Sequence, residues 1–317
     1  MCLYCQPLER LKLSRQCKNQ PSQPTLAAMP VAHYENFPVA SVLLPRKLRR
    51  PIEAIYRFAR GADDIADEGE ASDADRLREL DAYRRELDRI ENGAACTEAV
   101  FNELAAIIGE WRLPLPLFRD LIDAFAQDVV KKRYADYPEL LDYCRRSANP
   151  VGRLLLHLVD RTGEDDLRRS DCICTALQLI NFWQDIGIDW QKGRIYLPLC
   201  DLARFEIAEE QLGAGRWSAP WAALLDFQCE RTRRLMLEGA PLVHRLPGRM
   251  GWEIRLTVQG GLRILEQIRR ARGDIFRCRP RLRRVDWLVM AVRALFMQES
   301  RSIASKNPTA HGTANDA

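Results

Sequence analysis

The apolar residues of this chain recur every three to four positions along most of its length. That spacing places them on one face of a helix, and the strict alternation typical of a half-buried strand is not sustained. The pattern predicts helices over residues 73–90, up to about 111, over 117–130 and over 151–159, separated by Asn92 and Gly93 and by the prolines at 114 and 116. Pro45 and Pro51 are expected to mark the approach to a further helix. We predict one all-α domain of roughly ten or more helices.

Two stripes of acidic and amide residues, about 120 positions apart, interrupt the apolar pattern. One helix would place Tyr56, Arg60, Asp63, Asp64 and Asp67 within roughly a quarter-turn arc. A second would place Gln178, Asn181, Asp185 and Asp189 within a narrower arc, in a segment apolar enough to be buried. Carboxylates stacked at these spacings repel one another, so a buried run needs a cation or solvent opposite it.

The two stripes together predict a magnesium-diphosphate site. Mg²⁺ takes oxygen ligands and is usually held by one or two carboxylates together with substrate phosphates. An Asp-Asp-x-x-Asp run on a helix is by itself more often a solvated face. The apolar surroundings of both stripes favour the site, and Lys192 and Arg194 follow closely after the second stripe.

Composition excludes several classes of protein. The net charge of +4 is small for 317 residues and charges of both signs are interspersed, which argues against nucleic acid as a partner. No run reaches the roughly 18 uninterrupted apolar residues of a membrane span. The ten cysteines follow no disulfide or zinc spacing, so we expect a reduced, cytoplasmic protein.

An arginine-rich stretch precedes the apolar run at residues 287–296. It can be interpreted as a basic collar that brings an amphipathic helix onto the inner face of a membrane, or, more commonly, as a solvated turn before a core-packing helix. We expect residues 1–30 to be a disordered extension, 31–300 the folded domain and 301–317 a disordered tail.

The chain resembles the squalene/phytoene synthase family of isoprenoid enzymes. The resemblance rests on an ordered set of motifs, namely an N-terminal His/Phe segment with His33 and Phe37, the segments 60–67 and 137–144, Val151-Gly152, the segment 178–189 and the segment 194–198. It implies a single-domain isoprenoid (terpenoid) synthase fold with helices around a central apolar cavity.

The resemblance also implies a role for each matched residue. Metal ligands would be Asp63, Asp64, Asp67, Asn181, Asp185 and Asp189. Substrate would be bound by His33, Phe37, Tyr56, Arg60, Gln178, Lys192, Arg194 and Tyr196, although His33 can equally be a structural histidine. The catalytic set would be Asp63, Asp67, Asp185, Asp189, Tyr137 and Gln184, with Mg²⁺ as cofactor. The aromatic residues Phe37, Tyr56, Phe182 and Trp183 would line the path of a cation, or simply pack in the core.

Three departures narrow the comparison. Many family members have Arg where this chain has Gln184, and a small or Thr-containing stretch where it has Asn149 and Pro150. Carotenoid-type members often have Tyr where this chain has Gly261. These residues look most like the hydroxysqualene synthase branch, which would convert presqualene diphosphate and water to hydroxysqualene without NADPH. Asn149, Gln184 and Tyr137 are all candidates to hold the water.

Two alternatives remain. One is a head-to-head prenyltransferase that condenses two farnesyl or geranylgeranyl diphosphates, and the other is a non-catalytic homologue that binds lipid diphosphates or pathway partner enzymes. The intact set of acids argues against the second alternative, and Gln184 and Gly261 argue more weakly against the first.

Overall fold

In this computed structural model, residues 45–277 and 279–297 are described, and within them the regular elements are all helical, as the sequence predicts. The helices are α1 (Arg46–Asp67), α2 (Asp73–Glu91), α3 (Ala99–Trp111), α4 (Leu115–Val130), α5 (Tyr137–Ser147), α6 (Asn149–His157), α7 (Glu164–Gln191), α8 (Leu199–Arg204), α9 (Glu209–Ala214), α10 (Ala219–Gly239), the 3₁₀ helix η1 (Ala240–His244), α11 (Gly248–Arg270) and α12 (Arg284–Leu295). The expected terminal segments 1–30 and 301–317 lie outside the described residues.

Local signals in the sequence explain most helix ends. Ser72 caps α2 by accepting a hydrogen bond from the backbone N–H of Asp75, and Asp136 caps α5 by accepting one from Glu139. Pro116 and Pro150 lie in the first turns of α4 and α6, where the missing N–H would have had no helical partner. These two helices therefore begin slightly before the predicted residues 117 and 151.

Pro51 does not precede the first acidic helix, because α1 begins at Arg46 and contains it. The proline removes one helical hydrogen bond. Its ring is nevertheless buried, together with Leu48, Ile52 and Ile55, so the apolar face of α1 continues through this position. Burial of that face compensates for the lost bond and extends the helix beyond the predicted start.

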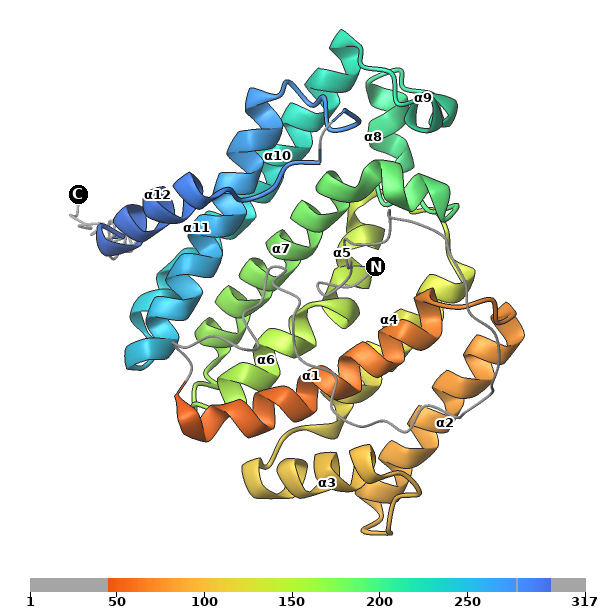
Figure 1. The fold of residues 1–317 in the computed structure, drawn as a ribbon, viewed down its shortest axis with the longest axis vertical. Helices are drawn as coiled ribbons and strands as arrows, with labels where there is room; N and C mark the ends of the chain where they lie inside the picture. The colour runs from red at the N-terminus through yellow and green to blue at the C-terminus, as the bar shows by residue number, and fades with distance from the viewer. Residues whose placement is uncertain (1–44, 278, 298–317) are drawn as a thin grey trace, which may run out of the picture.

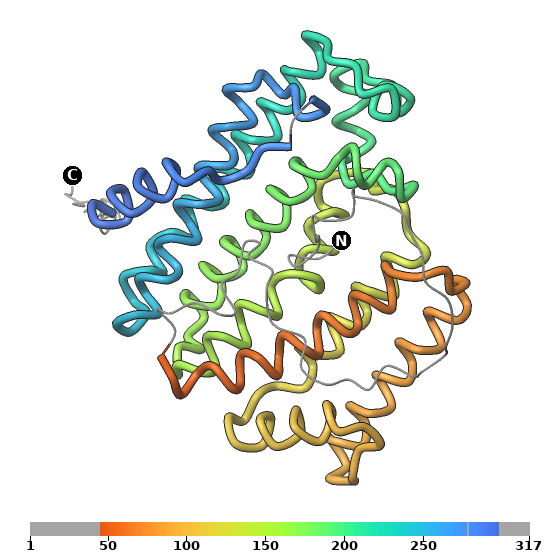
Figure 2. The backbone as a smooth tube through the Cα atoms, in the orientation of Figure 1, coloured from red at the N-terminus to blue at the C-terminus, as the bar shows by residue number. Residues whose placement is uncertain are grey.

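The long helix α7 runs through the middle of the bundle (Figure 1). It packs against α10 and α11 on one side and α5 and α6 on the other, while α1 packs against α2, α3 and α4. The backbone trace in Figure 2 shows α6 between α1 and α7. Helix α4 packs against α1 and also against α5 and α6. One continuous apolar core joins these elements, so the two acidic stripes are carried by one packed unit.

Two further features concern membrane spans and cysteines. No helix in the described part of the chain is long and apolar enough to cross a membrane. The six cysteines within it, Cys96, Cys144, Cys172, Cys174, Cys200 and Cys229, are free thiols.

Candidate active site

The first acidic stripe occupies the last two turns of α1. The side chains of Asp63 and Asp67 are almost completely buried, whereas 40% of the Asp64 side chain is exposed. Arg60 lies one turn earlier, with its guanidinium 3.5 Å from Asp63 Oδ2 and 2.5 Å from Asp64 Oδ1. Burial raises the pKa of Asp64 to about 6, and Arg60 partly opposes that effect.

The second stripe lies in the buried half of α7. Gln178, Asn181, Asp185 and Asp189 are all at least nine-tenths buried, as the surrounding apolar residues predict. Burial raises the pKa of Asp189 to about 8, and the neighbouring charge of Asp185 adds to the rise. One carboxylate oxygen of Asp189, Oδ1, has no hydrogen-bond partner in the structure described here. A buried carboxyl of this kind is stabilised when a cation binds beside it.

The loop after α7 connects the two stripes. Lys192 Nζ lies 3.1 Å from Asp67 Oδ2, and Arg194 Nη2 lies 2.5 Å from Asp67 Oδ1. Gly193, with a φ of 73°, makes the turn that brings both cations back toward α1. The loop is fixed on its other side by the N–H of Ile195, which donates to the carbonyl of Lys132 at 2.9 Å. The loop therefore brings Lys192 and Arg194, which follow the second stripe, into contact with Asp67 of the first stripe.

The pKa of Asp67 reflects these contacts. Burial alone would raise it, but the guanidinium of Arg194 and the ammonium of Lys192 help to hold it below its ordinary range. Arg194 is itself 5% exposed, and its Nε and Nη1 donors have no partners in the described part of the chain. Two unsatisfied donors on a buried cation suit an anion with several acceptor oxygens.

Arg279 is a site residue that the sequence analysis missed. Its Nε lies 2.5 Å from Asp185 Oδ1 and its Nη2 lies 3.1 Å from Asp185 Oδ2, a bidentate pair between α7 and the segment before α12. The adjacent Gln184 donates from Nε2 to the carbonyl of Pro280 at 2.8 Å. Gln184 is neutral where many family members have Arg, but Arg279 supplies a cation beside Asp185 from a distant segment.

Tyr196 and Tyr137 have different surroundings. Tyr196 stacks on Phe182 with ring centroids 3.9 Å apart, and its hydroxyl donates to Asp128 Oδ1 at 3.0 Å. Asp128 also accepts from Tyr143, and a buried acid within the apolar helix α4 is a signal that sequence reasoning overlooked. Tyr137 lies beneath the guanidinium of Arg231, 3.5 Å from the ring centroid.

Some of the remaining predicted residues have contacts within the described part of the chain, and others lie outside it. Tyr56 is partly buried against the core, Trp183 donates to Thr232 Oγ1 at 2.9 Å, and Asn149 Oδ1 accepts from Thr175 Oγ1 at 2.8 Å. His33 and Phe37 lie outside the described residues.

The donor set fits Mg²⁺ and a diphosphate, although the carboxylates are not gathered around one point. Among the described residues, no three acidic, His or Cys side chains are arranged to hold a single ion. Instead, five carboxylates, Asp63, Asp64, Asp67, Asp185 and Asp189, lie with four cations, Arg60, Lys192, Arg194 and Arg279. Hard oxygen ligands on two helices, together with basic donors for phosphate oxygens, are the chemistry such a site requires.

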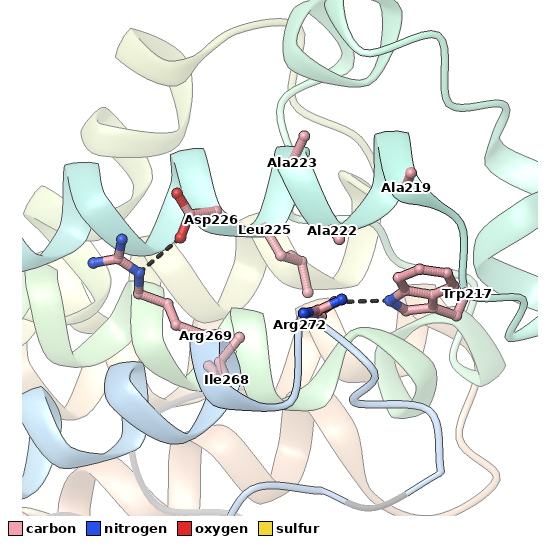
Figure 3. Close-up of a pocket in the computed structure, with 10 residues that line it drawn as sticks. Trp217, Ala219, Ala222, Ala223, Leu225, Asp226, Ile268, Arg269 and Arg272 are labelled. Atoms are coloured by element: carbon pink, nitrogen blue, oxygen red, sulfur yellow. Dashed lines mark hydrogen bonds and ion pairs between the residues drawn. The ribbon is translucent and has the colours of Figure 1, made fainter.

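A separate pocket of about 350 Å³ lies between α10 and the turn after α11 (Figure 3). Ala219, Ala222 and Ala223 of α10 line it, and Trp217 lies at one end, where its indole N–H donates to the carbonyl of Arg272 at 2.8 Å. The residues that line it include none of the predicted site residues.

The all-α bundle, with an acidic stripe on α1, another on α7 and a basic loop that contacts the first, fits the isoprenoid-modifying enzymes that the motifs resemble. The sequence matches the squalene/phytoene synthase family over residues 31–288, so the chain belongs to that family.

The relatives agree with this assignment. The hydroxysqualene synthase of Rhodopseudomonas palustris is 34% identical over 281 residues, which span 87% of this chain and 93% of the relative. The 15-cis-phytoene synthase of Synechococcus elongatus is 29% identical over 262 residues, 77% and 83% of the two chains.

Solved structures give the same result. The squalene synthase HpnC from Alicyclobacillus acidocaldarius superposes with a TM-score of 0.71 at 39% identity, covering 76% of this chain and 90% of that one. A dehydrosqualene synthase in complex with a ligand, 22% identical, has a TM-score of 0.72 over 80% and 88% of the chains and shares the fold.

Proposed function

We propose that this protein converts presqualene diphosphate and water to hydroxysqualene and diphosphate, with Mg²⁺ bound between the acidic stripes of α1 and α7. Support comes from the similarity to hydroxysqualene synthases over most of both chains. The observation that carries the reaction type is Gln184. Its Nε2 is engaged by the carbonyl of Pro280, while its buried Oε1 has no partner in the part of the chain that the structure describes.

Gln184 differs from an arginine in a way that matters for this chemistry. An arginine side chain has only donors, whereas a glutamine amide oxygen accepts a hydrogen bond. An unsatisfied acceptor beside Asp185 can orient a water molecule without adding positive charge near a carbocation. Among the three candidates for holding the water, Gln184 has a buried oxygen acceptor without a partner in the described part of the chain, whereas Asn149 Oδ1 already accepts from Thr175. We therefore assign the water to Gln184.

Different residues of the chain would bind the metal and the phosphate groups. Asp63, Asp67, Asn181, Asp185 and Asp189 would hold Mg²⁺, which supplies Lewis-acid stabilisation of the diphosphate as it leaves. Arg60, Lys192, Arg194 and Arg279 would bind the phosphate oxygens. The C–O bond breaks with both electrons on the diphosphate, the cyclopropane ring opens, and water adds to the resulting cation. The proton released by the water passes to the diphosphate or to solvent, which balances the reaction.

Gly261 gives independent support for a branch other than the carotenoid type. A Cβ atom at this position would lie 2.8 Å from Met236 Cε and 3.0 Å from Ile180 Cδ1. The glycine therefore lets α11 pack closely on α7 and α10, and a tyrosine side chain would require these residues to move.

The condensation of two prenyl diphosphates is the second candidate, and Arg279 favours it by supplying a cation beside Asp185. Incubation of the full chain with Mg²⁺ in H₂¹⁸O, without NADPH, separates the two. Presqualene diphosphate should give hydroxysqualene labelled at its hydroxyl. An unlabelled alcohol, or efficient conversion of farnesyl diphosphate to presqualene diphosphate, contradicts the proposal.

A matched pair of variants tests the metal site in the same assay. Asp185→Asn should abolish turnover, whereas Asp142→Asn, on the exposed surface of α5, should not. Full activity in EDTA, or equal losses in the two variants, would count against magnesium at this site.

A further inference from the structure

The outward surface of α12 is unusually apolar. Six large apolar side chains on this helix and at its C-terminal end are exposed. Trp287 (39%) lies to one side, and the other five are Val285 (66%), Leu288 (68%), Val292 (46%), Leu295 (62%) and Phe296 (76%). At 100° per residue these five fall within an arc of about 100°, so they form one continuous stripe, which we call the α12 apolar face. A cluster of this kind on a soluble surface marks an interaction site.

The inward surface of α12 is the more polar side. Arg263 on α11 donates from Nε to Asp286 Oδ1 at 2.6 Å, and Arg293 Nη1 lies 2.5 Å from Glu266 Oε1. Only Met290 and Ala294 add buried apolar side chains. An ordinary surface helix buries its apolar stripe and exposes its charges. Since α12 reverses that order, the core-packing interpretation of this segment does not describe it.

The charges around the α12 apolar face are of one sign. Arg281, Arg283 and Arg284 are exposed at or just before the N-terminus of the helix. The one acid between residues 281 and 297 is Asp286, which is buried and paired inward with Arg263. Arginines beside an apolar stripe complement an anionic lipid surface, with guanidinium groups among the headgroups and the stripe at the acyl boundary.

The location of α12 leaves this face accessible. Figure 1 shows α12 on the outer side of α11, at the edge of the bundle away from α2 and α3. A symmetric dimer through the same face would bury the arginine cluster of each copy without an acidic side chain of α12 to pair with it, since Asp286 is paired inward with Arg263. The charge pattern therefore favours a membrane over a second copy.

We propose that the α12 apolar face, with Arg281, Arg283 and Arg284, docks this protein onto the surface of a bilayer that contains anionic phospholipid. The helix lies in the plane of the interface and does not span the membrane. This inference goes beyond the proposed reaction and does not depend on it.

Vesicle flotation of the full chain tests the docking without any substrate. The protein should bind vesicles of phosphatidylcholine mixed with phosphatidylglycerol, bind phosphatidylcholine vesicles much less, and dissociate as salt rises. Arg281→Gln with Arg284→Gln should weaken binding roughly 25-fold, about fivefold for each arginine near the surface. The control pair, Arg78→Gln with Arg234→Gln, removes two side chains that are 77% and 78% exposed elsewhere and should bind like the wild type.

A second pair of variants tests the apolar contribution. Leu288→Gln with Val292→Gln should weaken binding about tenfold or more, because two side chains lose the transfer into the acyl boundary. Val130→Gln with Leu237→Gln is the matched control, since those side chains are 62% and 40% exposed on α4 and α10. Helical circular dichroism checks that each variant folds.

Three results would overturn the proposal. They are equal binding to neutral and anionic vesicles, equal losses in the α12 and control variants, and absence of wild-type binding at low salt. A concentration-dependent dimer that Leu288→Gln with Val292→Gln abolishes, without any vesicle binding, would assign the face to a second copy. If docking is lost in the variants but hydroxysqualene is never formed, the docking stands and the proposed reaction fails.

Discussion

Replacing Asp189 by Asn is expected to stabilise the metal-free protein at alkaline pH. The pKa of this buried carboxyl is raised from its ordinary value of 3.8 to about 8. The folded state therefore holds the proton more tightly than the unfolded state does. The stability that the protonated Asp189 carboxyl gives the folded state is fully present below about pH 3.8. It is lost as the pH rises from there to about 8, where the carboxyl ionises in the folded state. An amide of the same shape has no charge to bury.

The size of the effect follows from the pKa. A tenfold change in proton affinity corresponds to about 1.4 kcal/mol, so a displacement of the pKa from 3.8 to about 8 sets an upper limit of roughly 6 kcal/mol. We expect Asp189→Asn to raise the free energy of unfolding by roughly 2 to 5 kcal/mol at pH 8.5 in EDTA. Near pH 4 the two proteins should be almost equally stable.

Urea and thermal unfolding at several pH values, with EDTA or with Mg²⁺ and pyrophosphate, measure this difference. The ligands should raise the melting temperature of the wild type and have much less effect on Asp189→Asn. Asp286→Asn is the control, because the pKa of Asp286 is shifted in the opposite direction. Although burial raises the pKa of Asp286, bonds from Arg283 and Arg263 lower it overall, so that variant should lose stability at neutral pH and approach the wild type in acid. A pH-independent difference between Asp189→Asn and the wild type would refute the reasoning.

Three further predictions follow from side-chain contacts and can be measured by chemical unfolding. Asp128→Asn removes the charged acceptor for Tyr143 and Tyr196 and should cost roughly 1 to 3 kcal/mol; an unchanged unfolding midpoint would contradict this. Gly152→Ala should cost roughly 1 to 3 kcal/mol, because its Cβ would lie 2.4 Å from Ser170 Oγ, whereas Gly109→Ala on α3 meets nothing within 4 Å and should be neutral or stabilising. Arg279→Gln should destabilise the metal-free protein by roughly 3 kcal/mol, since Asp185 loses its bidentate partner, and Mg²⁺ with pyrophosphate should recover part of that loss.

The helical fold and much of the candidate site could be predicted from the order of residues. The spacing of Asp63, Asp67, Asp185 and Asp189 fixes which face of each helix carries them, because helical periodicity is a local property. Lys192 and Arg194 could be assigned for the same reason, since they follow Asp189 within five residues. Prolines predict helix starts less well. Pro51 lies inside α1, because packing of its buried neighbours outweighs the one helical hydrogen bond that it removes.

The roles of Arg279, Gln184 and α12 depended on the tertiary structure. Arg279 is one of several arginines in a basic stretch, and only the folding of that segment onto α7 places it, rather than its neighbours, against Asp185. The partner of Gln184 is the carbonyl of Pro280, a backbone group that every residue has and that no motif identifies.

The sequence alone therefore determined which side chains each helix could present and on which face. The tertiary structure decided which of them meet. A pairing between residues almost 100 positions apart depends on the packing of whole helices, so local spacing does not contain it. The same holds for α12. The periodicity of its apolar stripe predicts that the stripe is buried. In the structure Arg263 and Glu266 of α11 pair with the opposite side of α12, so the stripe faces outward.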